Sequence, residues 1–284
     1  MKLHSHKSDD SDLPVSTVRA MASDNPGVPR WDCFSRQSLL VPALQDVTPF
    51  ELGKAATQIR SFLGSLQFDE ILLSPLTSVP IDYLDHVIDV EGIGQLRFNT
   101  EPEIWQSAQY THRFYSISSL FRRETDINPL RRSAFYVVDF YQLGVPESML
   151  SIFRELLGAL ANAGIAPRLV ELPFDNIQYD LSIDGPSFVK GGARWAIASG
   201  YDAKHSFYEI NEEGVSTRHE LFLVTPDGFL EVGVFGLTGW NKNPDYKIRP
   251  GSSVAEIPDL RMSGMGFGLE RLLLAERILA AKQY

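Results

Sequence analysis

The stretch "SGMGFGLERLLL" (Ser263–Leu274) places glycines at alternate positions directly before an apolar run that is predicted to be a helix. These glycines are Gly264, Gly266 and Gly268. The predicted helix carries Glu270 and Arg271 in its first turn and continues to the C-terminus. A glycine-rich turn lets another chain or a ligand approach the backbone closely, because glycine has no Cβ. The turn therefore indicates either tight packing or a ligand site, and its spacing is not that of a dinucleotide-binding βαβ unit.

Arginines gather in the stretch "SISSLFRRETDINPLRRSAFYVVDFYQ" (Ser116–Gln142), which is predicted to be two strands around a polar break. Arginine is always charged and offers a planar fork of donors, so it suits phosphate groups. Because alternate residues share one face of a strand, a single surface of this hairpin is expected to combine a cation, carboxylates and aromatic rings. Its members are Arg122, Glu124, Phe135, Asp139 and Tyr141. Such a surface suits a nucleoside phosphate; the other interpretation is a solvated hairpin whose arginines pair with its own acids.

The composition limits the classes of function. The chain has 284 residues, a formal net charge of −10 and one cysteine, Cys33. An acidic chain is not expected to grip long stretches of nucleic-acid backbone, so we expect no DNA partner, although a small phosphate site remains possible. One cysteine excludes an internal disulfide and a thiolate metal cage, which fits a cytoplasmic location. No apolar run approaches membrane-span length, so no membrane partner is expected.

The rest of the pattern mixes helices and strands without a regular βαβ rhythm. A capping signal at Thr48 predicts a helix that begins at Pro49 and continues to about Gln67. A second helix is predicted over Glu147–Gly164. The stretches predicted as strands are Phe68–Pro75, a short one after Gly94 that precedes a helix from Thr100 through Trp105, and a run between Arg168 and Val234. The arrangement argues for an α+β fold with an antiparallel sheet flanked by helices. Residues 1–32 are polar and are predicted to form a flexible arm before one folded domain, 33–284.

Taken together, these stretches resemble the catalytic core of class II aminoacyl-tRNA synthetases. "FDEILLSPL" is similar to the first motif of that family, which ends at a proline, here Pro75. "FRRE", with Arg131 four residues before Phe135 and Asp139 four residues after it, is similar to the second motif. "GMGFGLERLLL" resembles the third motif and is the most specific of the three. The motifs occur in the family's order, and the compact layout is similar to that of pyrrolysyl- and lysyl/aspartyl-type cores. The resemblance implies that 33–284 is a class II synthetase-like catalytic domain.

The resemblance also implies an ATP site. Arg122 would hold the α-phosphate of ATP and the substrate carboxylate, and Arg131 would reach the γ-phosphate. Phe135 would stack on one face of the adenine, while Arg271 would cover the other face and touch the γ-phosphate. Glu124 would contact the adenine or the 3′ end of an acceptor.

A metal ligand and an amino-acid pocket follow from the same resemblance. Glu231, on a strand before the third motif, would bind Mg²⁺. The pocket would be lined by Asp139, Tyr141, Gln142 and Trp240. The implied reaction is attack of the amino-acid carboxylate on the α-phosphate, which gives an aminoacyl-adenylate and pyrophosphate. Bringing two anions together and neutralising their charge is what such a step requires.

Three departures from the family pattern leave more than one function open. The loop between Glu124 and Phe135 is about one residue longer than in lysyl-type cores, and Thr238 stands where a second magnesium carboxylate is expected. Nothing in the chain resembles an anticodon-binding domain. The first hypothesis is therefore an ATP-dependent ligase whose acceptor is the tRNA 3′ end, a protein, a carrier or a small amine. The alternative is a non-catalytic paralogue that acts as a regulatory or binding subunit. The family's first motif also implies a homodimer with Pro75 near the two-fold axis.

Overall fold

The fold is that of a computed structural model, which describes twelve ranges of the chain. They are 46–77, 87–100, 103–104, 112–123, 127, 129–130, 132–143, 149–177, 192–199, 217–226, 228–239 and 261–281. The predicted arm, 1–32, lies outside these ranges. Along the described residues, no helix combines the length and the apolar character needed to cross a bilayer.

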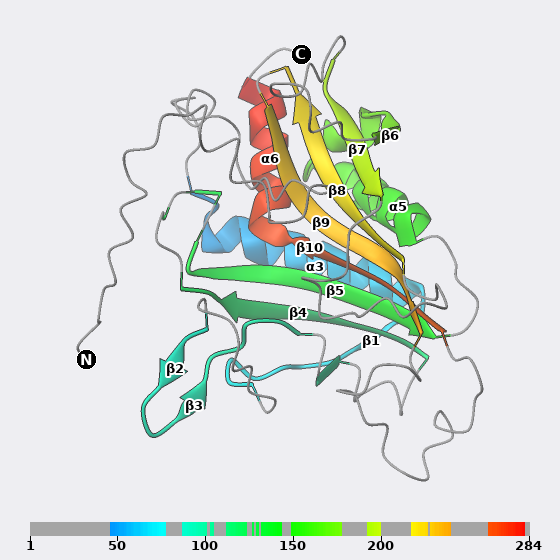
Figure 1. The fold of residues 1–284 in the computed structure, drawn as a ribbon. Helices are drawn as coiled ribbons and strands as arrows, with labels where there is room; N and C mark the ends of the chain where they lie inside the picture. The colour runs from blue at the N-terminus through cyan, green and yellow to red at the C-terminus, as the bar shows by residue number, and fades with distance from the viewer. Residues whose placement is uncertain are drawn as a thin grey trace.

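A sheet of eight strands forms the centre, in the order β1-β4-β5-β10-β9-β8-β7-β6 (Figure 1). Their bounds are β1 Asp69–Glu70, β4 Arg113–Phe121, β5 Ala134–Leu143, β6 Phe174–Ile177, β7 Arg194–Ser199, β8 Thr217–Thr225, β9 Gly228–Gly239 and β10 Arg261–Gly268. All neighbours are antiparallel except the edge pairs β1–β4 and β6–β7, which are parallel. A separate hairpin pairs β2 (Asp89–Val90) with β3 (Gly94–Gln95). The prediction of an α+β fold with a largely antiparallel sheet is confirmed.

Three helices cover one face of the sheet: α3 (Pro49–Ser65), α5 (Met149–Asn162) and α6 (Leu269–Ala281) (Figure 1). A short 3₁₀ turn, η2, spans Leu169–Glu171. Phe153 of α5 fills the layer between the helices and the sheet, with its ring centroid 5.7 Å from that of Trp195 and 5.4 Å from that of Phe267. This aromatic contact ties the middle strand β10 to the outer strand β7.

The ends of the predicted helices follow local rules. Thr48 caps α3 in a capping box: the Glu51 N–H donates to Thr48 Oγ1 at 3.3 Å, and the Thr48 N–H donates to Glu51 Oε2 at 2.8 Å. After α5, Gly164 takes a φ of +70°, a conformation that favours glycine. Both predicted helix positions are confirmed within a few residues.

The strand predicted over Phe68–Pro75 is much shorter than expected. Only Asp69 and Glu70 pair regularly with β4, after which Ile71 donates one main-chain bond to Tyr115. β1 is the edge of the sheet, so the following residues have a neighbouring strand on one side at most. Leu72 is consequently 83% exposed, and the segment ends in an isolated bridge between Leu76 and Leu96.

Candidate active site

The glycines of the third motif lie on a strand, which corrects the prediction of a turn. β10 runs to Gly268, and α6 begins at the next residue. In the register, Gly266 lies directly opposite Asp139 of β5, and Gly264 lies opposite Tyr141. A Cβ on Gly266 would stand 2.2 Å from Asp139 Oδ1, and one on Gly264 would stand 2.2 Å from the Tyr141 ring. The alternate glycines therefore make room for the two side chains predicted to line a pocket.

Asp139 and Tyr141 share the face of the sheet that lies away from the helices, which we call the site face. Their neighbours Val138 and Phe140 belong to the core under the helices, and successive residues of a strand point to opposite faces. The Tyr141 ring stacks on Phe114, with centroids 5.8 Å apart. The Thr100 hydroxyl donates to Asp139 Oδ2 at 2.5 Å. The prediction that both residues point to one side is confirmed.

Gln142 lies on the other side of the sheet. It pairs with Arg113, whose guanidinium donates to the Leu66 carbonyl at the end of α3, 3.2 Å away. Alternation along β5 gives the same result, because residues two apart share a face and Gln142 is two residues after Phe140. We therefore leave Gln142 out of the proposed pocket, since a side chain under the helices cannot line the site face.

Arg122 directly follows β4 and is held by the hairpin. Its N–H donates to the Ser133 carbonyl at 2.9 Å, so main-chain pairing continues one residue beyond the strand. The guanidinium carbon lies 4.8 Å from the centre of the Phe98 ring and 5.1 Å from that of Phe135. Such cation–π contacts are favourable and restrict the position of a long side chain. Arg122 and Phe135 therefore lie together on one surface of the hairpin, as strand alternation predicted.

Arg271 reaches the same region from the start of α6. The aliphatic part of its side chain would lie 3.6 Å from a Cβ on Gly268, so it crosses the site face of β10. Its Nε donates to the Leu130 carbonyl at 3.2 Å, and its NH1 donates to the Glu231 carbonyl at 3.2 Å. NH1 is also 3.5 Å from Glu231 Oε2. One arginine thus joins the hairpin loop, β9 and α6.

A β-bulge directs Glu231 to the site face. Leu221 of β8 pairs with Gly233, and the next residue, Phe222, pairs with Glu231, so Val232 is the extra residue. Val232 and Leu230 both belong to the core under the helices. Gly233 lies on the helix side, opposite the core residue Leu221. In a regular strand Glu231, two residues earlier, would face the helices as well. The bulge therefore explains how this carboxylate comes to lie beside Arg271.

Glu231 is a described carboxylate on the site face that could bind a metal ion. Across the described ranges, no three His, Cys, Asp or Glu side chains gather as a metal cluster. Mg²⁺ commonly binds one or two carboxylates and takes its other ligands from phosphate oxygens and water. Glu231 fits that minimal role together with a polyphosphate. The side chain of Thr238 is not among those described.

Glu270 was given no role by the sequence, and the structure gives it one. Both carboxylate oxygens accept from the Tyr136 N–H, at 3.0 and 2.9 Å. This bond continues the pairing of β5 past the last β10 pair, Gly268 with Val137. Glu270 is only 5% exposed, and burial raises the pKa of its carboxyl. It ties α6 to the residue that follows Phe135.

Two further residues of the site were missed by the sequence analysis, because no motif distinguishes them. Phe98 lies beside Arg122, and Thr100 holds Asp139. Both belong to a segment that was predicted as a short strand and the start of a helix. Glu124, Arg131 and Trp240 lie outside the described residues, so their roles stay predictions.

Comparison with solved structures identifies the fold. The chain is similar to asparaginyl-tRNA synthetase of Entamoeba histolytica, with a TM-score of 0.59 and 13% identity over 88% of this chain and 67% of that one. The complex of that enzyme with asparaginyl-adenylate gives a TM-score of 0.57 and 11% identity over 88% and 66% of the two chains. Asparaginyl-tRNA synthetase of Pyrococcus horikoshii, complexed with asparaginyl-adenylate, gives 0.56 and 12% over 87% and 68%.

These matches concern the fold. No protein-family model and no curated protein sequence matches the chain. The chain has the catalytic-core fold of class II aminoacyl-tRNA synthetases, as its three motifs predicted.

Proposed function

We propose that this chain is an ATP-dependent ligase that activates an amino acid as an aminoacyl-adenylate and passes it to an acceptor. The observation that carries the proposal is that Arg122, beside Phe135 of β5, and Arg271, beside Gly268 of β10, lie on the same face of the sheet as Asp139 and Tyr141. These residues come from distant parts of the sequence. Cations beside a buried carboxylate suit a reaction that joins an ATP phosphate to an amino acid.

In the proposed ATP site, Arg122 binds the α-phosphate and the substrate carboxylate. Phe135 and Arg271 cover the two faces of the adenine, and Arg131 and Glu124 complete the site as the motif implies. Arg122 is already fixed against two rings, so little reorganisation is needed when charge develops on the phosphate. The arginines thereby offset the repulsion between the two anions.

Magnesium fits this site through Glu231 and the phosphate oxygens of ATP. When bound, the ion would neutralise charge on the polyphosphate. The residues of the chain do the rest: they bind both substrates and align an amino-acid carboxylate oxygen with the α-phosphorus. The new bond is carboxylate oxygen to phosphorus, and the bond that breaks releases pyrophosphate.

The amino acid would bind on the site face beside β10. Asp139 would accept from an ammonium group of the substrate, either the α-amino group or a side-chain amine. Tyr141 would form one wall, with Trp240 as a proposed second wall. Because Asp139 is only 6% exposed, pairing it with a cation would offset the cost of burying its charge.

ATP–pyrophosphate exchange tests the proposal. The purified chain is expected to exchange labelled pyrophosphate into ATP with at least one of the standard amino acids, and only when Mg²⁺ is present. No exchange with any of them, while ATP still binds, would favour the non-catalytic paralogue.

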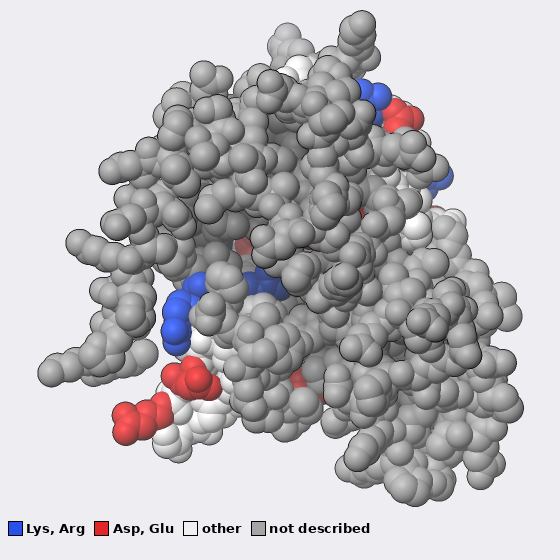
Figure 2. All heavy atoms as spheres, viewed as in Figure 1, with Lys and Arg blue, Asp and Glu red and all other residues white. Residues whose placement is uncertain are grey.

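For the acceptor, we favour a protein, carrier or small amine over tRNA. On the face shown in Figure 2, described basic side chains lie in a band left of centre and again at the upper right, in both places with acidic side chains nearby. The basic loop "NKNPDYKIRP", with Lys242, Lys247 and Arg249, lies outside the described residues. Salt-sensitive binding of total tRNA, lost when these three charges are reversed, would instead establish tRNA as the acceptor.

We also propose a homodimer through the segment after β1. Leu72 there is 83% exposed, and an apolar side chain of that exposure is often covered by a partner. Light scattering at micromolar concentration is expected to give twice the chain mass. A monomer would contradict the assignment of Pro75 to a two-fold axis.

A further inference from the structure

The segment 97–100 connects the edge of the sheet to the candidate active site. The Arg97 N–H donates to the Pro75 carbonyl at 2.8 Å, and the Arg97 carbonyl accepts from the Phe121 N–H at 2.8 Å. Phe121 is the residue directly before Arg122. The backbone of Arg97 therefore lies between the continuation of β1 and the end of β4.

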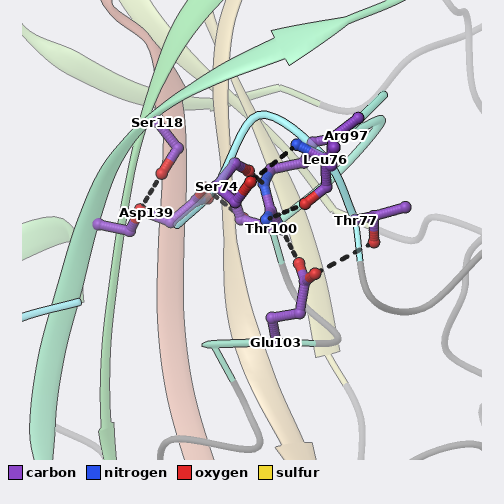
Figure 3. A network of polar contacts seen from close by, with 9 residues as sticks. Ser74, Leu76, Thr77, Arg97, Thr100, Glu103, Ser118 and Asp139 are labelled. Carbon is purple, nitrogen blue, oxygen red and sulfur yellow. Dashed lines mark hydrogen bonds and ion pairs between the residues drawn. The ribbon is translucent and has the colours of Figure 1, made fainter. Parts of the chain in front are cut away.

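The Arg97 side chain anchors this segment from inside the protein (Figure 3). Only 1% of the residue is exposed. Its Nε donates to the Ser74 carbonyl at 2.7 Å, its NH2 donates to the Leu76 carbonyl at 3.1 Å, and it forms an ion pair with Glu103. Burial lowers the pKa of Arg97 to about 10, so the guanidinium stays charged at neutral pH. A buried cation with these acceptors gives the segment one defined position.

Two side chains of the segment contact the two groups proposed to bind substrate. The Phe98 ring lies 4.8 Å from the Arg122 guanidinium carbon. Thr100 is 2% exposed and donates from Oγ1 to Asp139 Oδ2 at 2.5 Å. One anchored segment thus contacts both the proposed phosphate-binding arginine and the proposed ammonium-binding carboxylate.

The bond from Thr100 also holds the Asp139 carboxylate in one orientation. Oδ2 accepts from Thr100, while Oδ1 lies over Gly266, at the place where any other residue would carry its Cβ. Held by Thr100 on one side and packed against Gly266 on the other, the carboxylate has a defined orientation on the site face. A substrate N–H⁺ can then meet an acceptor whose orientation is set before binding.

We propose that Thr100 is a positioning residue: it orients the Asp139 carboxylate toward the ammonium group of the amino acid, and Arg97 fixes the segment that carries it. The inference rests on the proposed function for the identity of the ligand. It adds that binding of the amine depends on a hydroxyl at position 100, whereas binding of ATP does not.

The test compares Thr100→Val, which keeps the shape but loses the hydroxyl, with Thr100→Ser, which keeps the hydroxyl. The matched control is Thr77→Val, because Thr77 donates to Glu103 Oε1 at 3.2 Å in the network that holds Arg97. Thr100→Val is expected to raise the KM for the amino acid about tenfold or more and leave the KM for ATP within about twofold. Thr100→Ser and Thr77→Val are expected to stay near the parent on both constants.

A second measurement keeps the result decisive if the chain does not exchange pyrophosphate. Each standard amino acid is added to the parent and to Thr100→Val, and the shift in melting temperature is recorded. A shift lost only in Thr100→Val, without exchange by the parent, would support the positioning role and overturn the ligase. If the parent exchanges pyrophosphate and Thr100→Val keeps the parent KM for the amino acid, the positioning role is overturned and the proposed ligase function stands. Equal losses of amino-acid binding and ATP binding in Thr100→Val would have the same meaning. Neither a shift nor exchange would overturn both.

Discussion

The two sides of strand β10 carry opposite kinds of residue: large apolar side chains on one side and glycines on the other. One side carries Met265 and Phe267, each 1% exposed, packed under the helices. The other side carries Gly264 and Gly266, whose missing Cβ atoms leave the space that Tyr141 and Asp139 occupy. The same eight residues therefore serve packing on one side and a site on the other. The first side cannot lose atoms, and the second cannot gain them.

The largest effect is expected on the packed side. Phe267→Ala removes a ring that lies 5.4 Å from that of Phe153, and should lower the free energy of unfolding by about 3–5 kcal/mol. Urea unfolding measures the change. Ile93→Ala, at a residue that is 64% exposed, should change it by less than about 0.5 kcal/mol. A loss below about 1 kcal/mol for Phe267→Ala would show that this side of β10 is not the core.

On the site side, Arg122→Ala and Arg271→Ala should leave the protein folded but inactive. Each removes a charged contact proposed for the transition state, worth about 3 kcal/mol or about a hundredfold in pyrophosphate exchange. Arg154→Ala is the control, because Arg154 lies 4.1 Å from the Phe174 ring on the helix-covered side. Parent-like exchange by both site variants would refute the assignment.

Adding one methyl group to the site side of β10 should weaken amino-acid binding without unfolding the protein. Gly266→Ala would place a Cβ where Asp139 Oδ1 lies, so Asp139 must move. We expect the KM for the amino acid to rise about tenfold, with ATP binding unchanged, and Asp139→Asn should act in the same direction. Gly158→Ala is the control: nothing lies within 4 Å of its Cβ, and in α5 it should stabilise by about 0.5–1 kcal/mol. Equal losses for both ligands would mean that Asp139 only braces the hairpin.

The smallest effect is expected at the outer surface of α3. Bonds from Thr48 and Arg277 lower the pKa of Glu51 from 4.5 to about 2. Because the folded value is the lower one, the stabilisation is present above pH 4.5 and is lost as the pH falls towards 2. Glu51→Gln should cost less than about 1 kcal/mol at pH 7 and progressively less at lower pH, with exchange unaffected. Urea unfolding from pH 7 to pH 3 measures this, with the exposed Glu155→Gln as the control.

The sequence predicted what depends on local chemistry. The cap at Thr48, the two long helices and the shared direction of Asp139 and Tyr141 follow from capping and from strand alternation. The glycine strand was predicted as a turn, although glycines at every second position have the period of a strand. A search for that period would have found β10.

The remainder depends on contacts between distant segments. Thr100 and Asp139 are 39 positions apart, and nothing near either residue indicates the bond between them. Arg97 would be expected at the surface by composition alone, yet two carbonyls and Glu103 hold it inside. The bulge at Val232 depends on the register of β8 against β9, which one strand's sequence does not contain.

Because of that bulge, β9 can lose one residue without a change in the faces to which its other side chains point. Because Val232 is the residue without a partner of its own, deleting it would leave Leu221 opposite Gly233 and Phe222 opposite Glu231. Every remaining side chain of the strand would keep its face, so the deletion would leave side-chain orientation unchanged. Removing Leu230 or Val234 instead would exchange inside and outside for the residues on one side of the gap. For anyone trimming, splicing or permuting this chain, Val232 is a residue of β9 that can be removed in phase.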